Sequence, residues 1–272
     1  MQIYRDLQVI SARPTESEEA GAPHHLYGVA DASEAWSVGR WLRAAVPILD
    51  GIARKGRPAI VVGGTGLYFR APTEGLADLP APAPQVPLVA AQTFDEVGEA
   101  DFRIALAQVD PEAEARIMAG DKQRLVRAYS VFWGTGRSLT QWQALTSPTL
   151  APGSWTGVVI EPPRDQLYAR VDARARTMLQ TGALQEAMRL GARNLDPELP
   201  AMKAVGLQAF IAAAEGRIAS ADALERVAQD SRRYAKRQLT WLRNQTPEWS
   251  RIETLEPQGQ IAALFAILGV SA

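Results

Sequence analysis

The chain has 272 residues, enough for one large domain or two moderate ones with a buried core. Hydrophobic residues make up 47% and charged residues 22% of the sequence, which is typical of a folded globular chain and excludes a disordered tail. The 29 Lys and Arg residues nearly balance the 30 Asp and Glu residues, and the net charge is −1. A polyanion can therefore bind only where positive charge is locally concentrated.

The side-chain inventory excludes several kinds of chemistry. The sequence has no cysteine, which excludes disulfides, thiolate nucleophiles and thiolate zinc sites. Its two histidines, His24 and His25, are neighbours without a third ligand, so we assign no metal ligands and favour a turn or strand-entry pair. No apolar run approaches the roughly 20 residues of a membrane span, and residues 1–6 carry no signal-peptide pattern. We expect a cytoplasmic protein with no membrane partner.

The first predicted elements are a helix, a strand and a glycine turn. Ser33 is the predicted N-cap of a helix whose apolar residues recur at near-helical spacing from Trp36 to Ile52. The apolar run 58–62 follows as a buried parallel strand. It ends at the turn Gly63 to Gly66, with sequence GGTG, and a further helix opens directly after this turn. This order predicts αβα layering.

Proline then interrupts the pattern. The segment Leu79 to Pro87 holds four prolines and cannot be a helix interior, so we expect a hinge or domain junction there. Helices are predicted next over 94–108, 111–117 and 121–133. The last of them is stopped by Gly134-Thr135-Gly136, and a second Pro/Gly connection covers 147–153.

The rest of the chain returns to a mixed pattern. A second strand is predicted over 156–160, followed by helices over 165–181 and 221–244 with shorter ones between them. We therefore expect an α/β core, made of residues 1–75 and 150–272 with basic helices at its C-terminal end, and a helical insertion over 76–149.

The GGTG turn is the first candidate site. Backbone N–H groups of a glycine turn that opens a helix, together with the Thr65 hydroxyl, can face a phosphate where the helix dipole favours negative charge. A tight strand-to-helix turn that binds nothing explains the glycines equally well.

The predicted helix over 121–133 carries a second candidate. Gln123 and Arg127 share one helix face at i, i+4, and Arg124 lies beside them. The planar guanidinium of an arginine can bind two phosphate oxygens at once. The alternative is a solvated helix face with Asp121 as N-cap. The expected buried stripe consists of Leu125, Phe132 and Trp133.

A pair of arginines marks the helix over 165–181. Arg170 and Arg174 also lie at i, i+4, a spacing that could clamp a diphosphate. Equally, they could pair with Asp165 and Asp172 and have no other role.

The most basic stretch runs from Ser231 to Asn244 and contains no acidic residue. Its cations are Arg232, Arg233, Lys236, Arg237 and Arg243, interleaved with Tyr234 and Trp241. Like charges at i, i+4 disfavour an isolated helix by roughly 0.2–0.5 kcal/mol per pair, so something acidic should offset them. A polyphosphate partner would also explain the aromatic residues, whereas the alternative is again a solvated face.

Six segments in order resemble the tRNA dimethylallyltransferase (tRNA isopentenyltransferase) family over essentially the whole chain. They are MQIYRDLQVISARPT (1–15), PHHL (23–26), GGTGLYF (63–69), DKQRLVRA (121–128), LYARVDAR (167–174) and AKRQLTWLRN (235–244). The resemblance implies a P-loop-NTPase-like parallel α/β core with a helical insertion. It also implies transfer of a dimethylallyl group from dimethylallyl diphosphate to the exocyclic amine of the adenosine 3′ of the anticodon in tRNA, with Mg²⁺ as cofactor, by a monomer.

The resemblance also implies residue roles. Those implied to be catalytic are Thr65 and Arg174, and those implied to bind diphosphate are Gly63, Gly64, Gly66 and Arg170. Contacts to the tRNA anticodon arm are implied for Gln2, Gln123, Arg124, Arg127, Lys203, Lys236, Arg237, Gln238, Trp241 and Arg243. The family usually shows an aromatic and a basic residue where Leu207 and Gln208 stand, and an asparagine at Gly120.

The front of the chain departs most from the family pattern. Family members carry a strand, a GxTxSGKS-type P-loop, its helix and a second strand ending in Asp ahead of the Met-Gln that is here Met1-Gln2. No G-x-x-x-x-G-K-[ST] occurs in the 272 residues. We therefore expect an N-terminally truncated core that can self-associate, with doubtful activity because the phosphate-gripping lysine and the implied general base are missing. The alternative is a non-catalytic tRNA-binding remnant. A small-molecule kinase fragment ranks lower because it has no need of the basic helix.

Overall fold

The computed structural model describes residues 1–80 and 82–270. It separates into two compact units, Met1–Tyr68 with Gly153–Ala272 and Phe69–Pro152. The described residues are mostly helical and contain one small parallel sheet, in agreement with an α/β fold. No helix in these ranges is long and apolar enough to cross a membrane.

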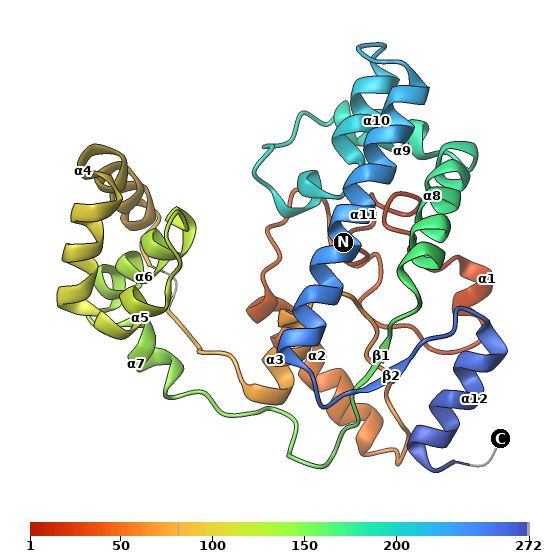
Figure 1. Cartoon of the computed structure of the whole chain (residues 1–272), viewed down its shortest axis with the longest axis horizontal. Coiled ribbons are helices and arrows are strands. Elements are labelled where there is room, and N and C mark those ends of the chain that lie inside the picture. The colour runs from red at the N-terminus through yellow and green to blue at the C-terminus, as the bar shows by residue number, and fades with distance from the viewer. Residues whose placement is uncertain (81, 271–272) are drawn as a thin grey trace. The chain divides into compact units, whose positions relative to one another are not determined.

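The elements follow one another along the chain as Figure 1 labels them. The first unit contains α1 (Glu16–Glu19), α2 (Val38–Ala53), the start of α3 (Leu67–Glu74), β1 (Val158–Ile160), α8 (Arg164–Gln180), α9 (Ala183–Gly191), the 3-10 helix η1 (Pro200–Lys203), α10 (Leu207–Ala214), α11 (Ser220–Gln245), β2 (Ser250–Ile252) and α12 (Pro257–Leu268). The second unit contains the rest of α3, α4 (Gln85–Val109), α5 (Pro111–Arg116), α6 (Lys122–Thr135) and α7 (Leu139–Gln143).

The main core of the first unit lies among its C-terminal helices. Helix α10 packs against α9 and α11, and α8 packs against α11 (Figure 1). Apolar side chains from these helices and from the N-terminal segment form the core: Tyr4, Leu7, Met178, Leu190, Leu207, Phe210 and Val227. The first half of α11 is thereby fixed by apolar burial, and its second half extends from this core.

One buried carboxylate attaches the N-terminal segment to this core. Glu186 of α9 accepts hydrogen bonds from three consecutive backbone amides, those of Gln8 (2.8 Å), Val9 (2.8 Å) and Ile10 (2.9 Å). These residues belong to no helix or strand, so their amides need acceptors from elsewhere. Glu186 supplies them.

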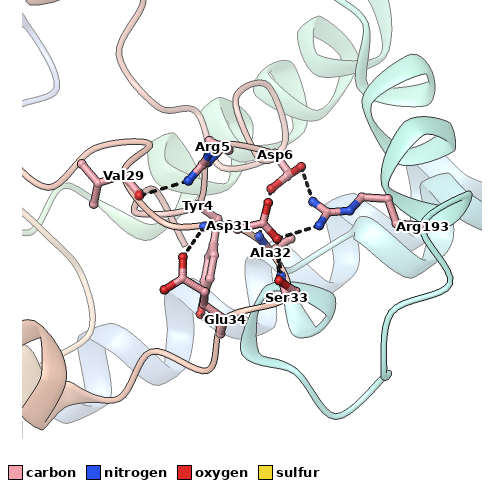
Figure 2. A network of polar contacts seen from close by, with 9 residues as sticks. All are labelled: Tyr4, Arg5, Asp6, Val29, Asp31, Ala32, Ser33, Glu34 and Arg193. Atoms are coloured by element: carbon pink, nitrogen blue, oxygen red, sulfur yellow. Dashed lines mark hydrogen bonds and ion pairs between the residues drawn. The ribbon is translucent and has the colours of Figure 1, made fainter.

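An ion-pair network adds a second attachment, shown in Figure 2. Arg193 donates to Asp6 (2.7 Å) and to Asp31 (2.6 Å), and Asp6 also accepts from the Ala32 amide (2.9 Å). The Arg193 guanidinium, followed by the hydroxyl and amide of Ser33, holds the pKa of the Asp31 carboxyl well below its usual range. The network joins the loop after α9 to two turns of the N-terminal segment.

The prediction of a strand over 58–62 is wrong. Ile60 is 79% exposed and Val62 72% exposed, and no strand among the described residues pairs with this segment. A β-strand exists only with a hydrogen-bonded neighbour, and local apolar character cannot supply one. The second predicted strand is confirmed in part as β1. It pairs in parallel with β2, from Val158 opposite Ser250 to Ile160 opposite Ile252, and β2 was not predicted.

Two helix starts also differ from the predictions. Helix α2 begins after Ser37, whose hydroxyl accepts from the Arg40 amide, so Ser33 is not its N-cap. Helix α4 begins at Gln85, inside the proline-rich segment, whose residue 81 lies outside the described residues. Pro87 fits there because the first turn of a helix needs no backbone N–H donor.

The second unit is organised around α6. Its predicted stop is confirmed, since the helix ends at Thr135 and Gly136 follows in the left-handed conformation at φ 72°. The predicted burial of Trp133 is wrong, because this side chain is 61% exposed. The buried residues of α6 are Leu125, Ala128, Ser130 and Val131.

The three hydrogen bonds from the amides of residues 8–10 to Glu186, here called the Glu186 clamp, lead to a prediction about stability. Glu186→Gln keeps the size of the side chain but turns one acceptor oxygen into an N–H₂ donor that faces backbone donors. We expect a loss on the order of 3 kcal/mol in the free energy of unfolding, measured by urea denaturation. The matched control is Glu215→Gln, which disrupts an exposed ion pair with Arg217 and should change stability little. Equal losses of unfolding free energy in both variants would contradict a stabilising role for the Glu186 clamp.

The Arg193 network predicts a pH dependence. Because the pKa of Asp31 is lower in the folded chain than in the unfolded chain, its contribution to stability is present above the unfolded value of about 4 and is lost as the pH falls through the folded value. Asp31→Asn should therefore lower the urea midpoint at pH 7, and the difference from wild type should shrink between pH 4 and pH 2. Asp50→Asn on the exposed surface of α2 is the control. A difference that is constant with pH would refute this account.

Candidate functional site

The GGTG turn lies against α11. The hydroxyls of Thr65 and Tyr234 are 3.0 Å apart. A Cβ atom on Gly64 would lie 2.1 Å from Nε2 of Gln238, and one on Gly66 would lie 2.1 Å from the ring of Trp241. Gly66 therefore has a packing role besides the turn itself, because a side chain there would collide with the Trp241 ring, whereas at Gly64 the flexible end of Gln238 could move aside.

The local sequence explains this contact. Tyr234, Gln238 and Trp241 are spaced i, i+4, i+7 and share one half-buried face of α11. Helix α3 opens directly after the turn, with the Tyr68 amide donating to the Thr65 carbonyl at 3.0 Å. Within 1–80 and 82–270, no acceptor takes the amides of Gly64, Thr65 or Gly66. The turn thus keeps backbone donors and a hydroxyl that could face an anion, and binding of a phosphate there stays a prediction.

A neighbouring face of α11 forms an open basic groove. The groove has a volume of about 540 Å³ and is lined by Arg233, Lys236, Arg237, Thr240, Trp241, Asn244 and Gln245. Trp241 belongs both to this groove and to the face that touches the turn. The basic groove and the GGTG turn therefore share the Trp241 side chain.

Some acidic partners of the basic stretch come from within the chain. Arg232 pairs with Asp172 of α8, and Arg243 pairs with Glu161 at 2.5 Å. Asp230, one residue before the acid-free stretch, lies 3.6 Å from Arg233. Among the described residues, Lys236 and Arg237 have no ion-pair partner, and both are exposed in the groove. The unbalanced charge of the acid-free stretch is therefore concentrated on these two residues.

A second hollow continues the basic surface toward η1. It has a volume of about 270 Å³, and its lining includes Lys203, Gly206, Gln208, Asp230, Arg233 and Arg237. The two departures from the family pattern have structural roles here. Leu207 is fully buried in the core, and the Gln208 side chain donates to the Met202 carbonyl at 3.1 Å.

The two arginines of α8 remain exposed. Arg170 and Arg174 form no ion pair with any residue in the described ranges, and Asp172, one of the partners considered for them, binds Arg232 instead. Partial desolvation and, secondarily, the Arg170 charge one turn away lower the pKa of Arg174. Two like charges without a carboxylate are stabilised by an anion, which fits a diphosphate.

The remaining predicted site residues lie elsewhere. Gln123, Arg124 and Arg127 are exposed on α6 of the second unit, where Asp121 caps the helix by accepting from the Arg124 amide at 3.1 Å. The Gln2 side chain donates to the Ala12 carbonyl at 2.7 Å and is committed to its own loop. The roles of all these residues in RNA contact stay predictions.

Sequence reasoning missed the partner of Thr65. Tyr234 was noted only as an aromatic residue within the basic stretch. Its spacing from Gln238 and Trp241 indicates a common face, but nothing local indicates that this face meets a turn 169 residues earlier. Asp172 and Glu161 were missed as partners of α11 for the same reason.

The fold and site define an α/β protein with a candidate phosphate-binding turn beside a basic, aromatic helix. The family model described as IPP transferase matches residues 2–245. Curated relatives agree: a "tRNA dimethylallyltransferase" of Caulobacter sp. (strain K31) is 55% identical over 261 residues, which is 96% of this chain and 84% of the relative. One of Phenylobacterium zucineum (strain HLK1) is 51% identical over 260 residues, with the same coverage. The chain belongs to the IPP transferase family.

Solved structures share the fold. A full-length tRNA isopentenylpyrophosphate transferase from Bacillus halodurans superposes with a TM-score of 0.68 at 26% identity, covering 98% of this chain and 84% of that one. A eukaryotic dimethylallyltransferase acting on tRNA gives a TM-score of 0.80 at 23% identity, covering 100% of this chain and 72% of that one. At that identity the second comparison supports the fold alone.

The groove predicts a salt-dependent affinity for RNA. Lys236→Gln with Arg237→Gln removes the two unpaired cations, so binding of an RNA hairpin should weaken and the slope of log K against log salt should flatten by roughly one to two units. Fluorescence anisotropy at several salt concentrations measures both. Lys55→Gln with Arg217→Gln is the control, with the same change in charge outside the residues that line the groove. An unchanged slope in the groove variant would leave α11 with a solvated face only.

Proposed function

We propose that this chain transfers a dimethylallyl group from dimethylallyl diphosphate to the exocyclic amine of the adenosine 3′ of the anticodon in tRNA. One observation carries the proposal: the GGTG turn is seated on the same helix that lines the basic groove. Donors for a diphosphate and a surface for nucleic acid thus occur together. The relatives described above are named for this transfer, and none of them is named for tRNA binding alone.

The transfer has clear physical requirements. The bond between the allylic carbon and the diphosphate oxygen breaks, a bond to the adenine nitrogen forms, and the alkylated amine passes its proton to solvent water. Negative charge develops on the departing diphosphate, and preorganised donors lower the barrier by stabilising it. The Thr65 hydroxyl and the free amides of the turn supply such donors, and Arg170 and Arg174 supply positive charge.

The tRNA has separate requirements. An adenine must leave its stack before its exocyclic amine can react, and aromatic side chains stabilise an unstacked base. Trp241 presents such a ring at the junction of groove and turn, beside the Gln238 amide. Lys236 and Arg237 would bind the phosphates of the anticodon arm, and Lys203 and Arg243 would do so on leaving their carboxylate partners Glu198 and Glu161. Gln123, Arg124 and Arg127 of the second unit would contact the tRNA as well.

Magnesium belongs to the expected reaction, but residues 1–80 and 82–270 offer it no built site. In the described part of the chain, no group of three or more His, Cys, Asp or Glu side chains is arranged to hold a metal ion. A Mg²⁺ ion held by diphosphate oxygens would need no such group. The steps derived above use only residues of this chain.

The proposal is tested by measuring product. The chain is incubated with dimethylallyl diphosphate, Mg²⁺ and a tRNA with adenosine beside the anticodon, and the modified nucleoside is quantified by mass. We expect product with the wild-type chain, a rate roughly 10²- to 10³-fold lower with Thr65→Val, and near-normal product with Thr65→Ser, because only valine lacks the hydroxyl. Thr93→Val, an exposed substitution in α4, is the matched control. No product, with full affinity for the anticodon arm, would refute transfer and support the non-catalytic tRNA-binding alternative.

A further inference from the structure

We propose that Tyr234 is a positioning residue that fixes the hydroxyl of Thr65 for the departing diphosphate. The inference rests on the proposed function, since it assigns a role to a side chain beside the reacting group. Tyr234 reaches Thr65 from a helix 169 residues later in the chain, with 3.0 Å between the two hydroxyl oxygens.

The direction of this hydrogen bond decides what Thr65 can do. A phenol is more acidic than an aliphatic alcohol, with a pKa of about 10, and is the better donor of the two. When Tyr234 donates, the Thr65 oxygen accepts and its own proton remains available to a diphosphate oxygen. An exposed threonine hydroxyl otherwise samples several rotamers and proton orientations. The bond removes that freedom before the anion arrives.

Tyr234 is itself held in place. Its side chain is half-buried, and the Arg237 guanidinium lies over its ring at 5.6 Å from the centroid. Arg237 also lines both hollows of the basic surface. The ring that orients Thr65 therefore packs against a cation of the proposed RNA-binding surface.

The turn is supported from its other end as well. Tyr68, three residues after Thr65, packs edge-on against Trp41 of α2, with ring centroids 5.1 Å apart. The close approaches of Gln238 and Trp241 fix Gly64 and Gly66 on either side of Thr65. With the backbone held by these contacts, the Tyr234 hydroxyl acts on the Thr65 side chain.

The first test separates positioning from binding. Tyr234→Phe removes only the hydroxyl, so kcat for transfer should fall about five- to tenfold while KM for tRNA and affinity for the anticodon arm stay unchanged. Tyr234→Phe with Thr65→Val should be no slower than Thr65→Val alone, whereas with Thr65→Ser the effect of Tyr234→Phe should persist. Tyr129→Phe in the second unit is the control for loss of a phenol hydroxyl. Additive effects of Tyr234→Phe and Thr65→Val, or a change in KM alone, would overturn the inference.

A second test does not depend on turnover. Inorganic pyrophosphate is titrated by calorimetry into wild type, Tyr234→Phe, Thr65→Val and the double variant. Each single variant should bind about five- to tenfold more weakly, and the double variant no more weakly than Thr65→Val. Coupling here without any transfer by wild type would overturn the proposed function and leave the positioning role supported. Transfer by wild type without coupling would overturn the positioning role alone, and absence of both pyrophosphate binding and transfer would overturn both.

Discussion

The close approach of the GGTG turn to α11 is the constraint on which the site depends. A 26-residue helix is roughly 39 Å long, so α11 can serve different partners along its length. Its first half buries Ala223 and Val227 in the core with α10. Its second half is too polar to bury, and it is anchored instead by the Asp172 ion pair and by side chains that fit against two glycines. A side chain at Gly66 would collide with the Trp241 ring, whereas one at Gly64 would meet only the flexible end of Gln238.

The positive charge available at the site is what remains after cations of α11 have paired with carboxylates of the same chain. The net charge of the chain is −1, and three of the six cations of α11 (Arg232, Arg233 and Arg243) are offset by carboxylates on α8, on α11 itself or after β1. Offset cations stabilise the packing of the helix but attract little from solution. Lys236 and Arg237, together with Arg170 and Arg174 on α8, are the cations left for an external anion among the described residues discussed here. A nearly neutral chain can in this way present a focused positive surface.

The sequence predicts local features well and distant ones poorly. Helical spacing and caps correctly placed α6, α8 and α11, because those signals depend on residues within a few positions of one another. The prediction of a strand over 58–62 was wrong because a strand needs a hydrogen-bonded neighbour, and residues 58–62 do not determine whether one is present. The predicted burial of Trp133 was wrong because several faces of α6 carry apolar residues, and only the position of α4 decides which of these faces is buried. The Thr65–Tyr234 contact could not be predicted from spacing, since it joins segments that meet only after α11 has packed.

The Glu186 clamp has a consequence for the order of events during synthesis. Gln8, Val9 and Ile10 leave the ribosome before the carboxylate that receives their amides, which lies 176 to 178 residues later in the chain. At 5–20 residues per second, the N-terminal segment waits roughly 9–35 seconds before its acceptor has been made. During that interval its amides have only water or transient partners, and a molecular chaperone would find an extended segment to bind. Residues 8–10 are therefore translated well before their acceptor, and they can dock on it only once α9 has been made.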